Sequence, residues 1–137
     1  MMVSTKGRYA LRVMLDLAAQ PTEEYISLKA ISDRQEVSMK YLEAIVANLC
    51  KAGMLDSLRG KSGGYRLNKS TAEYSVGAIV RAVEGDLSPV SCLEENKGGC
   101  NRAGECLTLP MWQKLDRIVG EYLDSVTLED LLTQNFE

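Results

Sequence analysis

The 137-residue sequence predicts a mainly α-helical fold with one small β-hairpin. Three short segments with helical apolar spacing open the chain, a glycine-rich segment follows them, and a longer periodic segment lies near the end. With 45% hydrophobic and 26% charged residues, the composition is ordinary for one globular domain. No apolar run reaches the ~18 residues of a membrane span. The apolar N-terminal stretch carries Arg8, Arg12 and Asp16, unlike a secretory signal, so we expect a cytoplasmic protein.

The first helix is expected to begin near Ser4 or Thr5 and to end before Pro21. Its apolar stripe consists of Tyr9, Ala10, Val13, Met14, Leu17 and Ala18. Ser27 is an N-cap for a short second helix that should end near Gln35.

The third helix is the best specified segment. Ser38 is its N-cap, Val37 can pack against Leu42, and Gly53 follows as a residue free to turn left-handed. Its apolar face consists of Leu42, Ile45, Val46 and Leu49. Because only a few residues separate the second helix from the third, the pair predicts a helix-turn-helix.

A β-hairpin is expected directly after the third helix. Residues 54–58 and 65–67 can form its strands, and Gly60, Gly63 and Gly64 between them suit the positive φ of hairpin turns. A hairpin in this place is a wing. The N-terminal part of the chain therefore predicts a winged helix-turn-helix domain.

The second half begins with a fourth helix, capped by Ser75 and ending at Gly85. Residues 86–106 lack periodicity, and a long helix is expected from about Pro110 to Ser125. Thr127 to Asp130 resembles a capping box for a short terminal helix with Leu131 and Leu132. We therefore divide the chain into a winged domain at 1–85, a cysteine-bearing loop at 86–107 and a helical segment at 108–137.

The net charge of −3 is unevenly distributed. Residues 1–70 hold 11 basic and 7 acidic side chains, whereas residues 71–137 hold 5 and 12. A basic half can meet phosphate although the whole chain is acidic. Arg59, Lys61, Arg66 and Lys69 occur in one stretch without an acid, a pattern that is also typical of a solvated loop.

In a helix-turn-helix the second helix enters the major groove and its N-terminal residues reach base edges. The outward positions in the first turns of the third helix are Ser38, Met39, Lys40, Tyr41, Glu43 and Ala44. We interpret Glu43 as a specificity residue, because phosphates repel a carboxylate unless it accepts a hydrogen bond from cytosine. In the wing, Arg59 and Lys61 can contact phosphate, and Gly60 permits close backbone approach. Alternatively, these residues are only a solvated surface.

An enzyme is the least favoured class. The sequence has no histidine, no phosphate-binding glycine loop followed by Lys-Ser/Thr, and no Gly-x-Ser-x-Gly motif.

Three of the four cysteines, Cys92, Cys100 and Cys106, fall within 15 residues. In a reducing compartment thiols this close favour a metal over disulfides, and sulfur ligands favour zinc or an iron–sulfur cluster. The three cysteines leave the fourth ligand of such a site unidentified. Cys50 is the remaining thiol, but its place beside the apolar face of a helix is more typical of a small buried side chain. The other candidates are Glu94, Glu95, Asn101, Glu105, Thr108, a partner subunit's residue or a water.

Several segments resemble the IscR/NsrR/CymR-type winged-helix regulators. The matching segments are Ser4 to Arg12, Ser38 to Glu43, Gly63 to Leu67 and Val76 to Gly85, together with three cysteines ahead of a long helix. The resemblance implies a homodimer joined through the helix at about residues 110–125, bound to double-stranded DNA at a pseudo-palindromic promoter site.

For family members with this cysteine trio, the resemblance also implies a 2Fe-2S cluster with Cys92, Cys100 and Cys106 as ligands. Two features depart from the family pattern. The first cysteine gap is seven residues instead of the commoner five, and Leu107 to Leu109 replace a histidine that often follows the last cysteine. Arg8, which cannot ligate, stands where some relatives carry an acid.

The leading hypothesis is a dimeric transcriptional regulator, most simply a repressor, that senses iron–sulfur or redox status through a 2Fe-2S cluster. In one alternative the cysteines hold zinc or act as free thiols. In another, a partner metabolic enzyme controls the regulator, as in relatives that respond to cysteine metabolism.

Overall fold

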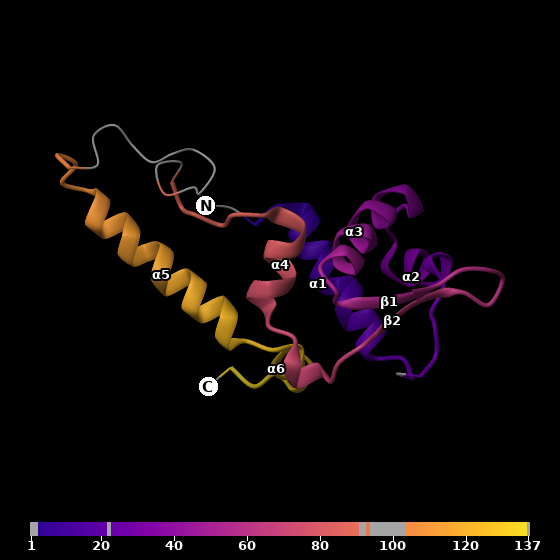
Figure 1. Ribbon diagram of the computed structural model, residues 1–137. Helices are drawn as coiled ribbons and strands as arrows, with labels where there is room; N and C mark the ends of the chain where they lie inside the picture. The colour runs from indigo at the N-terminus through magenta and orange to yellow at the C-terminus, as the bar shows by residue number, and fades with distance from the viewer. Residues whose placement is uncertain (1–2, 22, 91–92, 94–103, 137) are drawn as a thin grey trace.

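The computed structural model describes residues 3–21, 23–90, 93 and 104–136. Its elements are α1 (Thr5–Ala18), α2 (Leu28–Gln35), α3 (Met39–Lys51), β1 (Leu55–Leu58), β2 (Gly64–Leu67), η1 (Thr71–Glu73), α4 (Val76–Glu84), α5 (Leu109–Ser125) and α6 (Leu128–Thr133). Helices α1 to α4, the hairpin and α6 form what we call the head. Helix α5 extends along one side of the head, and the hairpin tip lies on the opposite side (Figure 1).

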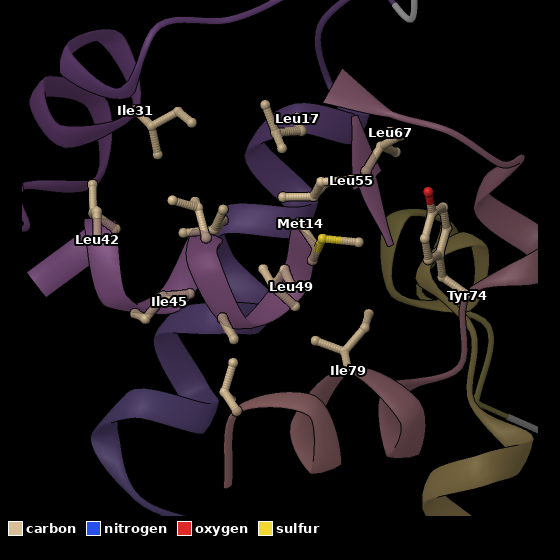
Figure 2. Packing of buried hydrophobic residues seen from close by; sticks show 14 of the residues in the cluster. Met14, Leu17, Ile31, Leu42, Ile45, Leu49, Leu55, Leu67, Tyr74 and Ile79 are labelled. Atoms are coloured by element: carbon tan, nitrogen blue, oxygen red, sulfur yellow. The ribbon is translucent and has the colours of Figure 1, made fainter. Parts of the chain in front are cut away.

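Apolar side chains from every part of the head meet in one core (Figure 2). The labelled core residues are Met14, Leu17, Ile31, Leu42, Ile45, Leu49, Leu55, Leu67, Tyr74 and Ile79. The stripe predicted for the third helix is fully buried, and four of the six residues in the stripe of the first helix are buried. The apolar periodicity of the sequence therefore identified the core correctly.

The hairpin is short and is extended by a third segment. β1 and β2 pair antiparallel from Leu55 opposite Leu67 to Leu58 opposite Gly64. Ile26 and Tyr65 exchange backbone hydrogen bonds of 2.9 and 2.8 Å across the outer edge of β2. A Cβ atom at Gly64 would lie 2.1 Å from the Ile26 carbonyl oxygen, so this close pairing requires glycine.

The C-terminal part of the chain is attached to the head beside α4. The Val76 N–H donates to the Val126 carbonyl at 2.7 Å, and the Leu128 N–H donates to the Tyr74 carbonyl at 3.0 Å. Leu128 is fully buried in the core of the head. The division of the chain at residues 85 and 107 stays a prediction, with the added finding that α6 contributes to this core.

The predicted helices are all present, with ends within a residue or two of those expected. The predicted N-caps Ser27, Ser38 and Ser75 accept hydrogen bonds from backbone N–H groups, and the capping box of α6 is formed. The short η1 was not predicted. Its Ser70–Glu73 capping box is visible in the sequence, but no apolar periodicity follows it. In the part of the chain that the structure describes, no helix has the length and apolar character to cross a bilayer.

Asp16 is the buried charged residue of α1, and it joins α1 to α2. The Arg34 guanidinium donates to both of its carboxylate oxygens at 2.7 to 3.2 Å, and the Gln35 amide donates to Oδ2 at 2.9 Å. Burial raises the pKa of Asp16, but the hydrogen bonds from Arg34 and Gln35 outweigh burial and leave that pKa below its usual value. The carboxylate is therefore more stable in the folded chain than in the unfolded one.

We expect Asp16→Asn to lower the free energy of unfolding at pH 7 by about 1–3 kcal/mol, with solvent around the half-exposed Arg34 limiting the loss. Because the folded-state pKa is depressed, the carboxylate stabilises the fold above pH ~4, and this contribution disappears as the pH falls through the folded-state pKa. Urea unfolding between pH 7 and pH 3 should show that the free energies of unfolding of the parent and of Asp16→Asn become equal at the acidic end. A difference that stays constant down to pH 3 would contradict this assignment.

Candidate nucleic-acid interface

The turn between α2 and α3 is tight and closed by side chains. Glu36 adopts a left-handed conformation with φ 56°, and only residues 36–38 separate the two helices. The Ser32 hydroxyl donates to the Val37 carbonyl at 2.5 Å, and the Ser38 hydroxyl accepts from the Tyr41 N–H at 3.2 Å. This geometry is that of a helix-turn-helix, with α3 in the place of the recognition helix.

The outer face of α3 is exposed, as expected. Its side chains at the first turns are Ser38, Met39, Lys40, Glu43 and Ala44. Tyr41 differs, because its ring is half-buried and packs edge-on against the Tyr9 ring of α1, with centroids 5.8 Å apart. Tyr41 therefore has a packing partner as well as an accessible edge, a feature that the sequence did not indicate.

The four basic residues of the hairpin region separate into two groups. The Arg66 guanidinium lies 4.3 Å from the centre of the Tyr25 ring and donates to the Glu23 carbonyl at 3.0 Å. The Lys69 ammonium lies over the Tyr74 ring. Arg66 thus joins β2 to the segment before α2, and Lys69 lies against an aromatic ring just after the hairpin.

Arg59 and Lys61 are the other group. They are exposed, together with Gly60, and no ion pair within the described residues engages either cation. Both lie in the turn of the hairpin, on the side of the head away from α5 (Figure 1). These two side chains are therefore available to phosphate.

Cys106 is the member of the cysteine trio that the structure describes; Cys92 and Cys100 lie outside the described residues. Its sulfur lies 3.1 Å from the Thr108 hydroxyl, just ahead of the N-terminus of α5. Hydrogen bonds from the Thr108 side chain and from the Thr108 and Leu109 N–H groups lower the pKa of the Cys106 thiol. A half-exposed thiol with a lowered pKa gives up its proton more readily to become the thiolate donor that zinc or an iron–sulfur cluster takes.

A complete metal-ligand set is not visible: the described residues contain no group of three or more cysteine or carboxylate side chains placed around one point. Cys50 is half-buried against the core, and burial followed by the negative charge of Asp56 raises the pKa of its thiol. In Figure 1, α3 and the N-terminal end of α5 lie on opposite sides of α4. Cys50, half-buried against the core with a raised thiol pKa, is therefore not among the proposed ligands.

Helix α5 has an apolar stripe without a partner in this chain. Four large side chains on one face are 38% to 57% exposed: Met111, Leu115, Ile118 and Tyr122. Leu107, just before the helix, is 97% exposed. An apolar stripe of this length on a described helix that buries none of its own residues is typical of a protein interface.

The comparisons with known proteins agree with this geometry. The model of the family described as Rrf2, iron-dependent transcriptional regulator, matches residues 3–134. The chain belongs to the Rrf2 family. Among Rrf2 relatives, IscR of Vibrio parahaemolyticus, an HTH-type transcriptional regulator, is 36% identical over 135 residues, covering 98% of this chain and 79% of that protein.

Solved structures give the same result. CymR, the global cysteine regulator of B. subtilis, superimposes with a TM-score of 0.78 at 38% identity, covering 99% of both chains. IscR of T. potens superimposes with a TM-score of 0.76 at 38% identity, covering 99% of this chain and 89% of that chain. The protein is thus an Rrf2-type transcriptional regulator with a winged-helix fold, as the resemblance implied. IscR of V. parahaemolyticus is described as a transcriptional regulator and CymR as a global cysteine regulator.

Proposed function

We propose that this Rrf2 protein is a homodimer that reads a pseudo-palindromic duplex site with α3 and the hairpin turn. The contacts proposed for α3 are Ser38, Met39, Lys40, Tyr41 and Glu43, and those for the wing are Arg59, Gly60 and Lys61. The supporting observation is that Arg59 and Lys61 stay uncommitted while Arg66 and Lys69 are held by aromatic rings. Uncommitted cations beside an exposed recognition helix suit a duplex with negative phosphates on both edges of its groove.

Selection of duplexes from a random pool with the intact protein tests this proposal. The selected sequences should contain two inverted half-sites, because a two-fold symmetric dimer presents the same helix twice. Fluorescence anisotropy should then give an affinity for the selected duplex at least about 10³-fold above that for unrelated duplexes at the same salt concentration. Enrichment of no common sequence would reject the proposal.

Arg59→Gln tests the role of the wing. If Arg59 neutralises a phosphate, the slope of log affinity against log salt should become shallower by about 0.9 per subunit, or about 1.8 for a dimer. Affinity for selected and unrelated duplexes should fall alike. Arg117→Gln on α5 removes the same charge away from the hairpin and should leave the slope unchanged. An unchanged slope for Arg59→Gln, or an equal change in both variants, would contradict the assignment.

The apolar stripe of α5 supports the dimer. Its exposed residues follow one face of a helix that is ~25 Å long. The same face of a second copy can pack against it across a two-fold axis. The opposite side of α5 is fixed to the head: the guanidinium of Arg81 on α4 pairs with the Asp124 carboxylate at 2.5 Å, where Gly77 leaves room. Since α5 is attached in this way, the dimer would set the separation of the two α3 helices.

We further propose that Cys92, Cys100 and Cys106 hold a 2Fe-2S cluster, with zinc as the alternative. The half-exposed Cys106 thiol beside the Thr108 hydroxyl, with its lowered pKa, fits such a ligand. When bound, a cluster would supply a redox-sensitive centre at this point of the chain. Because α5 begins at Leu109, a change in the position of Cys106 would be passed directly to the dimer helix and, through Arg81 and Asp124, to the head.

The similarity to CymR favours a second candidate function. That structure is named as a global cysteine regulator, and this chain matches it along its whole length. In this candidate the protein regulates cysteine or sulfur metabolism, and a partner enzyme or free thiols replace the cluster as the signal. Both candidates use the same DNA-reading surface and differ only in the use of the cysteines.

A further inference from the structure

Helix α1 carries a polar stripe beside its buried apolar one. Tyr9, Arg12 and Asp16 follow one another at spacings of three and four residues, so they share one face of the helix. This face lies at the edge of the core, where Tyr9 packs against the core and Asp16 is buried. It contacts the last two residues of α2 and the first turn of α3.

Asp16 forms the deepest contact of this stripe. Its carboxylate accepts hydrogen bonds from the Arg34 guanidinium and the Gln35 side-chain amide. Arg34 and Gln35 are the last two residues of α2. An ion pair between a buried carboxylate and a half-exposed guanidinium is often no more stabilising than apolar side chains of the same volume. Its hydrogen bonds, however, are directional, whereas apolar packing is not. The pair therefore fixes the orientation of the end of α2.

Arg12 adds a second clamp at the same point. Its Nη2 donates to the Gln35 backbone carbonyl at 2.7 Å, and its Nε donates to the Gln35 side-chain oxygen at 3.0 Å. The last carbonyls of a helix lack partners within the helix, so Arg12 caps α2 where the chain turns into α3. Together, Arg12 and Asp16 bond the backbone carbonyl and the side chain of the residue that precedes the turn.

The stripe also reaches α3 itself. The Arg12 guanidinium lies 4.9 Å from the centre of the Tyr9 ring, and the Tyr9 ring packs edge-on against Tyr41. Tyr41 lies in the first turn of α3, among the residues proposed to contact DNA. The apolar face of α3 sets how deeply the helix sits on the core, but directional contacts at its N-terminal end are needed to set its angle.

We infer that Arg12 and Asp16 are positioning residues for DNA reading, which hold the turn after α2 and the N-terminal end of α3 in one orientation. The inference rests on the proposed function, since it requires α3 to read the duplex. Neither residue is proposed to touch DNA. Their loss should therefore reduce the discrimination between DNA sequences more than the electrostatic part of the affinity.

Arg12→Lys tests the inference while keeping the charge, because a lysine cannot reproduce the two-pronged contact of the guanidinium. We expect its affinity for the selected duplex to fall at least about tenfold, which is the effect of losing one good base contact. Its affinity for unrelated duplexes should stay within about twofold of that of the parent. The slope against salt should not change. Arg8→Lys is the matched control: Arg8 lies on the same helix, donates to Thr5 and makes no contact with the turn, and the variant should behave as the parent.

Asp16→Asn is the second variant, of nearly the same shape, and should lower the same affinity ratio. Thermal unfolding of each variant identifies a temperature at which it is fully folded, and the affinities are compared at that temperature. An unchanged ratio in both folded variants would overturn the inference. A third variant, Arg12→Ala, gives another outcome that would overturn the inference. If it weakens binding to all duplexes equally and makes the slope of log affinity against log salt shallower, Arg12 is a phosphate contact. If the parent protein itself shows no sequence preference, the proposed function fails and the inference falls with it.

Discussion

Ile118→Glu should convert the dimer into a monomer and abolish tight binding to the selected duplex. Ile118 lies in the middle of the apolar stripe of α5, 51% exposed in the single chain, and a pair of facing carboxylates there would be desolvated without partners. A monomer loses the effective concentration that links two half-sites, so we expect the affinity to fall by about 10²–10⁴-fold. Analytical ultracentrifugation and anisotropy on the same samples measure both effects.

Gln113→Glu is the control for this experiment. Gln113 is exposed on α5 and lies roughly opposite the stripe, so the same negative charge should leave both the dimer and the affinity unchanged. A dimeric Ile118→Glu variant would mean that the stripe is not the interface. A monomeric variant with full DNA affinity would mean that the two α3 helices act separately.

Replacement of Cys92, Cys100 and Cys106 by serine should remove all bound iron and the visible absorption of the anaerobically reconstituted protein. Serine keeps the size of the side chain but is a poor ligand for iron at neutral pH, since its hydroxyl stays protonated. The DNA affinity of this variant should be the same with and without iron and sulfide. Iron and sulfide analysis, visible spectra and anisotropy give the three measurements.

Cys50→Ser is the matched control for the cysteine experiment. Cys50 packs against the core and not beside Cys106, so this variant should bind iron as the parent does. A colourless parent protein after reconstitution would reject the cluster. If that parent contains zinc, the zinc alternative for the three cysteines becomes the better description. If the triple variant regulates as the parent does, control by a partner enzyme becomes the better description.

The helices and the core could be predicted because their signals are local. An N-cap such as Ser38 and an apolar stripe such as that of Leu42 and Ile45 specify a helix and its buried face within about four turns. The hairpin was predictable for the same reason, since Gly60 and Gly63 lie between two short segments that can form strands. These features depend on residues that are near one another in the sequence.

The sequence could not predict which charged side chains bind other parts of the chain and which stay free, because this depends on contacts between distant segments. Arg66 and Arg59 look alike in the sequence, and they are separated by the contacts of Arg66 with the Tyr25 ring and the Glu23 carbonyl. In the same way, nothing near Asp16 in the sequence indicates that Arg34 will lie within 3 Å of its carboxylate. The residues proposed to contact DNA stay predictions, and the structure adds that Tyr41 is partly held by Tyr9.

Hydroxyl-radical footprinting of the parent protein on its selected duplex tests the central claim most directly. Two copies of α3 in adjacent major grooves predict two protected regions related by a dyad, with centres about 34–36 Å apart or a whole multiple of this distance, on one face of the duplex. The protection flanking each half-site should weaken in Arg59→Gln. A single protected region without two-fold symmetry would contradict the account of a dimer that reads DNA with α3.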